Sequence, residues 1–263
     1  MGGLQQERLG NLLRVTLDEP PVNALSRALI EALGQVAETV AADPSISVLH
    51  LRSTGRAFCA GANLDEMRVG FSGPQGLEQQ LVFVRRLQQV FERIERLDAV
   101  SVAEVGGHAL GGGLELALAC DLRIGTAEAR IGLPEVELGL VPGAGGTQRL
   151  TRLCGPALAR RLILGAETLD GRTAEQLGLL HWAVPKAELA ARAQALVDRL
   201  AQLPRAALAE AKACIDCATR PGTEGFEHEL VSTRRLMTDA ETQRRVAAFL
   251  ARFPSPTASF FFP

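Results

Sequence analysis

Short apolar segments alternate with amphipathic segments along roughly the first 190 residues of the chain. Leu12–Leu17 and Ser47–Leu51 have the composition of buried strands, and Ser26–Ala41 between them carries apolar residues at helical spacing. A strand, a helix and a second strand in such close succession are typical of a parallel sheet, because parallel neighbours need a long crossover connection. The pattern therefore predicts an α/β fold.

The last part of the chain has a different pattern. Beyond the α/β region, which we predict to span residues 1–190, the segments that follow all favour helices, and residues 191–263 contain no predicted strand. A helical region without a sheet of its own has to bury its apolar faces on the first region or on another subunit. The tail after Phe253 is rich in Pro and Phe and predicts a non-globular or docking segment.

Charge and composition exclude several classes of protein. The formal net charge is −2, which argues against a nucleic-acid binder that works by neutralising phosphates. Hydrophobic residues make up 47% of the chain and exclude disorder. We find neither a signal peptide nor an apolar run long enough to span a membrane, so we expect a cytoplasmic protein with no membrane partner. Cys214 and Cys217 have the C-x-x-C spacing, but without a second pair we expect core thiols and no metal site.

Glycine is concentrated in one segment, since 11 of the 26 glycines fall between Gly106 and Gly146. A predicted strand at Ala99–Val105 leads into Gly106–Gly113 and then into a short apolar helix. A strand, a glycine turn and a helix N-terminus form a natural anion site. The segment could be a tight turn, a nucleotide loop or an oxyanion hole. Neither the G-x-G-x-x-G nor the G-x-x-x-x-G-K-[ST] spacing is present, which argues against a nucleotide loop.

A second loop of small residues, Gly55–Asn63, follows the Ser47–Leu51 strand and could supply another backbone amide at the same end of the sheet. Two carboxylates lie in apolar surroundings nearby in the sequence, Glu115 in GLELALAC and Glu135 in GLPEVEL. Next to an oxyanion hole they could move protons at a carbon beside a carbonyl group. Alternatively, Glu115 could cap its own helix and Glu135 could pair with an arginine.

Five segments together resemble the crotonase superfamily, the enoyl-CoA hydratases and isomerases, and most closely the hydratases. They occur in the family's order between about Leu12 and Phe249: Pro21–Leu25 (PVNAL), Ala57–Ala62 (AFCAGA), Ala109–Ala117 (ALGGGLELA), Leu133–Glu135 (LPE) and Pro142–Leu150 (PGAGGTQRL). The resemblance implies a spiral of ββα units and a helical C-terminal region that mediates trimer contacts. It also implies an acyl-CoA substrate, no separate cofactor, and assembly as a homotrimer or a dimer of trimers.

The resemblance implies a site as well. The amides of Ala62 and Gly112 would form the oxyanion hole, Glu115 would orient and activate water, and Glu135 would transfer a proton at the α-carbon. Substrate-binding positions carried over in the same way are Ala60, Ala62, Asn63, Leu64, Asp65, Gly112 and Gly143. The implied reaction is the reversible syn addition of water to a trans-2-enoyl-CoA, which gives a 3-hydroxyacyl-CoA. Double-bond isomerisation, hydration of a branched substrate such as methylglutaconyl-CoA, and acyl-CoA binding without turnover remain open.

The sequence departs from the family pattern at several positions. Lysines that commonly meet the CoA phosphates are absent, so we expect Arg56, Arg68 or Arg252 to take that role. Glu104 replaces a small residue in the strand before the glycine turn. Nothing in the sequence explains this charge.

Overall fold

The computed structural model describes residues 3–219 and 222–252, and the Phe-rich tail lies outside them. The chain forms two compact units, Met1–Ala201 and Gln202–Pro263. The boundary that we expected after residue 190 falls inside helix α7 (Lys186–Ala201), which contacts the sheet of the first unit. This helix belongs with the α/β unit because its apolar face, with Leu189, Ala193 and Val197, is buried there.

The first unit is built around a six-stranded sheet with the order β1-β2-β3-β5-β7-β10. Strands β1 and β2 form an antiparallel hairpin, and the pairs from β2 to β10 are all parallel. The strand bounds are β1 Gly3–Leu9, β2 Leu12–Asp18, β3 Val48–Ser53, β5 Val100–Val105, β7 Leu122–Thr126 and β10 Trp182–Val184. The parallel sheet predicted from the alternating pattern is confirmed.

A second sheet consists of very short strands in the order β4-β6-β8-β9. Their bounds are β4 Ala57–Cys59, β6 His108–Leu110, β8 Arg130–Gly132 and β9 Leu169–Asp170. Each of β4, β6 and β8 follows a strand of the first sheet after a turn and is followed by a helix or a 3-10 helix. The chain thus repeats a ββα unit, which confirms the predicted spiral. The sequence analysis treated Gly106–Gly113 as a single turn and missed β6 within it.

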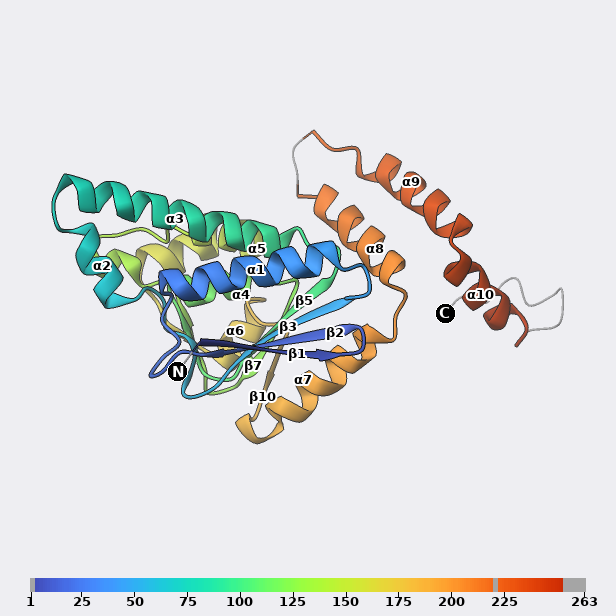
Figure 1. Cartoon of the computed structure of the whole chain (residues 1–263), viewed down its shortest axis with the longest axis horizontal. Helices are drawn as coiled ribbons and strands as arrows, with labels where there is room; N and C mark the ends of the chain where they lie inside the picture. The colour runs from blue at the N-terminus through green and yellow to red at the C-terminus, as the bar shows by residue number, and fades with distance from the viewer. Residues whose placement is uncertain (1–2, 220–221, 253–263) are drawn as a thin grey trace. The chain divides into compact units, whose positions relative to one another are not determined.

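Helices cover both sides of the large sheet (Figure 1). α7 lies across one face and contacts β2, β3, β5 and β7, while α1 and α3 run side by side on the opposite side. Ser26 caps α1, accepting a hydrogen bond from the Leu29 amide at 3.1 Å. The helices of this unit are α1 Arg27–Ala42, α2 Leu64–Gly70, α3 Pro74–Glu95, α4 Gly112–Leu118, the 3-10 helix η1 Glu135–Leu138, α5 Gly146–Leu164, α6 Gly171–Gln176 and α7.

Glycine lets helix α4 begin in direct contact with β4. A Cβ atom on Gly113 would lie 2.0 Å from the Cys59 carbonyl oxygen, a distance that no side chain tolerates. The N-terminus of α4 therefore packs directly against the β4 backbone. This contact brings the two glycine loops of the sequence together.

The unexplained Glu104 lies on β5 with 6% of its surface exposed, next to a second buried polar residue. The His50 Nε2 and Glu104 Oε2 atoms are 2.9 Å apart across the β3–β5 pair. A buried carboxylate needs such a partner because desolvation otherwise makes the charge costly. Glu104 is therefore part of a pair within the sheet.

The second unit is helical, with α8 Arg205–Cys217, α9 Gly225–Thr238 and α10 Ala240–Leu250. Between α8 and α9, the Ser232 hydroxyl donates to Glu210 and lies 3.4 Å from the Cys214 sulfur. Cys214 and Cys217 are free thiols. Among the residues that the structure describes, no helix combines the length and the apolar character that a membrane crossing requires.

Candidate active site

The candidate site lies where the segments after β4 and β6 meet. Gly61 and Gly111 have φ angles of +96° and +53°, a region that side chains rarely occupy. A Cβ atom on Gly61 would lie 3.5 Å from the Gly112 nitrogen and 3.0 Å from the Leu110 carbonyl oxygen. The two loops therefore approach each other closely only because both positions are glycine.

Two backbone amides at this junction point away from their own secondary structure. Leu25 forms a parallel β-bridge with Ala62, in which both hydrogen bonds go to the residues on either side of Ala62. The Leu25 amide donates to the Gly61 carbonyl at 2.8 Å, and the Leu25 carbonyl accepts from the Asn63 amide at 3.3 Å. This leaves the Ala62 amide on the opposite side of the bridge. Gly112 is the first residue of α4, where amides have no partner within the helix. Within residues 3–219 and 222–252, neither amide has an acceptor.

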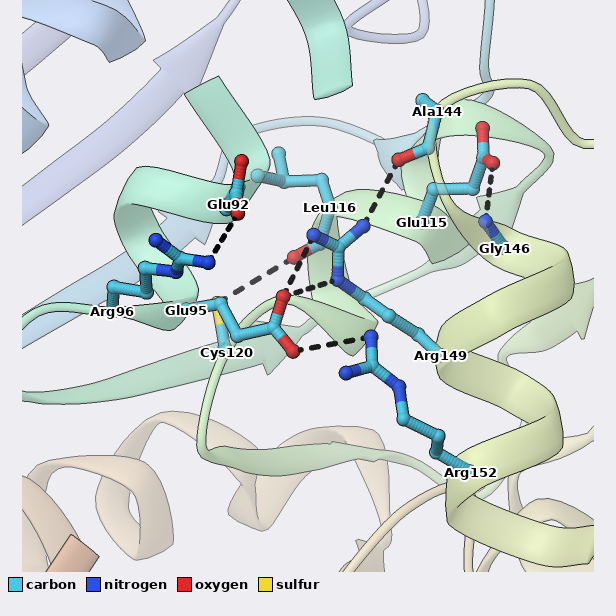
Figure 2. A network of polar contacts seen from close by, with 10 residues as sticks. All are labelled: Glu92, Glu95, Arg96, Glu115, Leu116, Cys120, Ala144, Gly146, Arg149 and Arg152. Atoms are coloured by element: carbon cyan, nitrogen blue, oxygen red, sulfur yellow. Dashed lines mark hydrogen bonds and ion pairs between the residues drawn. The ribbon is translucent and has the colours of Figure 1, made fainter. Parts of the chain in front are cut away.

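Glu115 is almost completely buried on α4, with 3% of its surface exposed. Figure 2 shows its side chain turned toward the turn before α5, where its Oε1 atom accepts a hydrogen bond from the Gly146 amide at 2.7 Å. The pKa of Glu115 is raised to about 7, chiefly by burial and to a smaller extent by the charge of Glu135, against the opposing effects of the Gly146 amide and Arg149. The carboxylate bonds to another helix, and the alternative of a cap for its own helix is wrong.

Glu135 begins the 3-10 helix η1 after β8 and packs against the glycine loop that contains Gly111. Its Oε1 atom lies 3.0 Å from the position of a Cβ atom on Gly111. Its Oε2 atom is buried and has no hydrogen-bond partner in the part of the chain that the structure describes. Burial raises the pKa of Glu135 as well. An ion pair with an arginine, the alternative reading of the sequence, is not formed among these residues.

The two carboxyl groups flank the same pair of glycines, since Glu135 faces Gly111 and Glu115 Oε2 lies 3.8 Å from a Cβ position on Gly112. Burial raises the pKa of both carboxyls, so each keeps its proton to a higher pH than an exposed carboxyl does. Such a pair can accept a proton at one carboxyl and donate at the other. The two unpaired amides beside them can stabilise an oxygen that becomes negative.

The other predicted substrate-binding residues differ in their surroundings. The Asn63 side chain caps α2, accepting from the amides of Asp65 and Glu66 at 2.9 and 3.2 Å. Leu64 is 69% exposed, and Ala60 donates its amide to Val22. Asn63 and Ala60 thus shape the loop through backbone contacts, and Leu64 is free to contact a ligand.

Gly143 connects the site to a surface hollow. The hollow has a volume of about 840 Å³ and is lined by Arg27, Glu31, Leu81, Val82, Phe83, Val84, Arg85, Arg86, Gln88 and Gln89. A Cβ atom on Gly143 would lie 3.3 Å from Val84, and the Gly143 carbonyl accepts from the Gln88 side chain at 2.6 Å. The hollow therefore borders the loop at residues 143–146, whose Gly146 amide donates to Glu115.

Of the three arginines expected to meet CoA phosphates, Arg56 is exposed directly before β4. Arg68 is exposed on α2 and pairs with Asp65 at 3.3 Å, and Arg252 lies in the second unit. Arg56 and Arg68 are thus accessible on the two segments that flank the Ala62 loop. Among the described residues, no group of three or more His, Cys, Asp or Glu side chains could hold a metal ion.

Sequence reasoning did not single out Arg149 or Glu95. Arg149 is 8% exposed in the first turn of α5, and its Nε and Nη2 atoms donate to Glu95 Oε2 at 3.0 and 2.8 Å. Its Nη1 atom donates to the Ala144 carbonyl at 2.9 Å (Figure 2). The sequence carries no local signal for this pair, because Arg149 and Glu95 lie 54 residues apart.

Comparison with known proteins places this geometry in context. The family model described as "Enoyl-CoA hydratase/isomerase" matches residues 7–256. The chain is 38% identical over 258 residues to the 2,3-dehydroadipyl-CoA hydratase of Escherichia coli (strain K12), covering 96% of this chain and 97% of that protein. It is 35% identical over 211 residues to the mitochondrial methylglutaconyl-CoA hydratase of Homo sapiens, covering 80% and 60% of the two chains.

A solved structure shows the same similarity at the level of the fold. The enoyl-CoA hydratase from Bacillus anthracis is 30% identical and superimposes with a TM-score of 0.88, covering 95% of this chain and 96% of that one. The similarity extends over nearly the whole chain and includes the segments that build the site. The chain therefore belongs to the enoyl-CoA hydratase/isomerase family, within the crotonase superfamily that its motifs resemble.

Proposed function

We propose that this protein is an enoyl-CoA hydratase, which reversibly adds water to a trans-2-enoyl-CoA and forms a 3-hydroxyacyl-CoA. The observation that carries the proposal is the pair of carboxyls, the buried Glu115 and the half-buried Glu135, on either side of two glycines that lead to unpaired backbone amides. Hydration requires a group that takes a proton from water and a group that gives one to carbon. Two carboxyls side by side, one ionised and one protonated, would supply both.

The Ala62 and Gly112 amides would hold the thioester oxygen of the substrate. When water adds at the β-carbon, the electrons of the double bond move toward the thioester and the oxygen gains negative charge. Two fixed donors stabilise this charge without reorganising, and loss of one such donor typically slows a reaction by about 10²–10³. The protein contributes main-chain groups here, so only changes that displace the backbone would test them.

The protons balance between the two glutamates. In the reactive state that we propose, Glu115 is ionised and takes a proton from the water as its oxygen bonds to the β-carbon, while Glu135 is protonated and gives its proton to the α-carbon. The product gains one hydroxyl and one hydrogen, and a proton passing from Glu115 to Glu135 restores the starting state. Because both carboxyls flank the same pair of glycines, we propose that both additions occur on one face of the substrate, which is syn addition.

The rest of the substrate would occupy the neighbouring surfaces, and we propose no cofactor besides the acyl-CoA itself. The acyl chain would extend toward the hollow that borders Gly143, and Leu64 would contribute apolar surface. Of the three arginines expected at the CoA phosphates, Arg56 and Arg68 lie in the first unit and are exposed. Guanidinium groups suit this role because they bind phosphate oxygens in pairs.

The proposal is tested with crotonyl-CoA, whose enoyl absorbance is lost on hydration. We expect turnover by the purified protein and a fall of at least about 10²-fold in kcat for Glu135→Gln, because the amide cannot deliver a proton. The control is Glu137→Gln, which removes an exposed carboxyl from the same 3-10 helix and should leave kcat within about twofold. Full activity of Glu135→Gln would refute the assignment.

For each of two other reactions there is one observation in favour. The methylglutaconyl-CoA hydratase relative favours hydration of a branched substrate, and the family's name includes isomerases. A panel of straight, branched and dicarboxylic enoyl-CoA thioesters, compared by kcat/KM, separates these substrates, and product analysis separates hydration from isomerisation. Tight acyl-CoA binding without any product would instead indicate a binding protein.

We also propose that the protein assembles as a homotrimer or a dimer of trimers through its helical unit. Large apolar residues of this unit are exposed, with 71% for Ile215, 84% for Phe226, 64% for Leu230 and 69% for Met237. Exposed apolar surface of this extent is typical of a subunit interface. Sedimentation velocity measures the assembly, and a monomer at micromolar concentration would contradict it. The cytoplasmic location stays a prediction.

A further inference from the structure

Arg149 links the catalytic carboxyl region to the end of helix α3. Its guanidinium is held by Glu95 on one side and donates to the Ala144 carbonyl on the other (Figure 2). The Gly146 amide, two residues beyond Ala144, is the group that donates to Glu115 at 2.7 Å. A continuous chain of hydrogen bonds therefore runs from Glu95 through Arg149 and the backbone to Glu115.

The turn between Ala144 and Gly146 is shaped around this guanidinium. Gly145 has a φ angle of +108°, and a Cβ atom on it would lie 2.2 Å from Arg149 Nη1. A Cβ atom on Gly146 would lie 2.9 Å from Glu115 Oε1. The turn is thus packed against Arg149 on one side and against Glu115 on the other, with only glycine fitting between them. A displaced guanidinium would displace the peptide that binds the carboxylate.

We propose that Arg149, held in place by Glu95, is a positioning residue that fixes the 144–146 turn so that the Gly146 amide keeps Glu115 oriented and ionised for the activation of water. This role rests on the hydration proposed above. Arg149 touches the turn and does not touch Glu115, so it acts on the reaction through the backbone and through its charge.

The electrostatic surroundings of Glu115 support this role. The charged groups that act on it are Glu135 from η1, which raises its pKa, and Arg149 from α5, which lowers it. The thiol on the adjoining strand β4, Cys59, is protonated because burial raises its pKa to about 12. Burial is the largest effect on Glu115 and raises its pKa, so loss of Arg149 removes part of the opposition and moves the pKa upward.

The test is the pH profile of kcat and KM with crotonyl-CoA for Arg149→Met, Arg149→Lys and Glu95→Gln. We expect Arg149→Met to lower kcat at neutral pH by about 10- to 100-fold, as loss of an orienting partner commonly does. The acidic limb of kcat should move to higher pH, with activity partly recovered in alkaline buffer and with KM nearly unchanged. Arg149→Lys keeps the charge and should restore the position of the limb more than the size of kcat.

The matched control is Arg152→Met. Arg152 contacts the same carboxylate, Glu95, at 3.5 Å but is exposed and is not bonded to the turn. Its loss should leave kcat within about twofold and the acidic limb unmoved. A kcat loss in Arg149→Met that is the same at every pH, or wild-type activity in that variant, would overturn the proposal.

Two further measurements keep the outcome decisive. If Arg149→Met does not fold, Glu95→Gln leaves the arginine in place with a weaker anchor and should move the limb in the same direction by a smaller amount. Isotope-edited infrared spectroscopy follows the Glu115 carboxyl without any turnover, and an unchanged titration in Arg149→Met would also refute the role. An inactive wild-type protein would refute the proposed function, while this titration still decides the role of Arg149.

Discussion

Replacing Glu115 by glutamine should stabilise the folded protein in a strongly pH-dependent way. The pKa of Glu115 is about 7, mainly because of burial, against an ordinary value of 4.5. At about 1.4 kcal/mol for each pKa unit, the ionised carboxyl lowers the free energy of unfolding by about 3 kcal/mol. Glutamine has nearly the same shape, keeps an oxygen for the Gly146 amide and carries no charge, so it removes this cost.

The direction follows from the proton balance. Below a pH of about 4.5 the carboxyl is protonated in both the folded and the unfolded chain and has no effect. Between about 4.5 and 7 the unfolded chain releases the proton while the folded protein keeps it, so stability falls as the pH rises. Above about 7 the full cost is present. Relative to wild type, Glu115→Gln should therefore gain about 3 kcal/mol between the acidic and the alkaline limits.

The assay is equilibrium unfolding in urea at a series of pH values, with both proteins at one concentration so that assembly contributes equally. Taking the difference between the two proteins cancels the titrating groups that do not interact with Glu115. Glu137→Gln serves as the control, because it removes an exposed carboxyl for which there is no burial to relieve. A pH-independent difference for Glu115→Gln would refute the reasoning, since it would mean that the buried carboxyl titrates alike in the folded and unfolded chain.

Two further substitutions test the backbone and the sheet. Gly61→Ala places a Cβ atom 3.5 Å from the Gly112 nitrogen at a φ of +96° and should lower kcat/KM by about 10²–10³. The control is Gly10→Ala, which has a φ of +60° and open space around it and should affect stability alone. Equal activity in the two variants would contradict the assignment of the amides. Glu104→Leu leaves the His50 ring without its carboxylate partner and should destabilise the fold by about 1–3 kcal/mol with kcat unchanged. Adding His50→Leu in a double-mutant cycle should recover part of that loss, and strictly additive effects would show that the pair does not interact.

Much of the fold could be predicted from the sequence because its signals are local. Helix α1 and its cap at Ser26 follow from apolar spacing and from one side-chain hydrogen bond within the same turn. The strands of the second sheet were missed because β4, β6 and β8 have three residues each, too few to show a period. The boundary of the helical unit was placed inside α7, because an amphipathic pattern does not say which surface covers its apolar face.

For the candidate site, too, some features could be predicted from the sequence and others could not. The sequence by itself determined the glycine loops and marked Glu115 and Glu135, since a charge among apolar residues is costly unless it has a role. Only the tertiary structure decided that Glu115 bonds to an amide 31 residues away and that Arg149 joins this turn to Glu95, 54 residues away. Sequence patterns record the periodicity and the backbone freedom of a segment. Which groups from different segments meet, and therefore which proton a carboxyl keeps, depends on how the ββα units stack and exclude water.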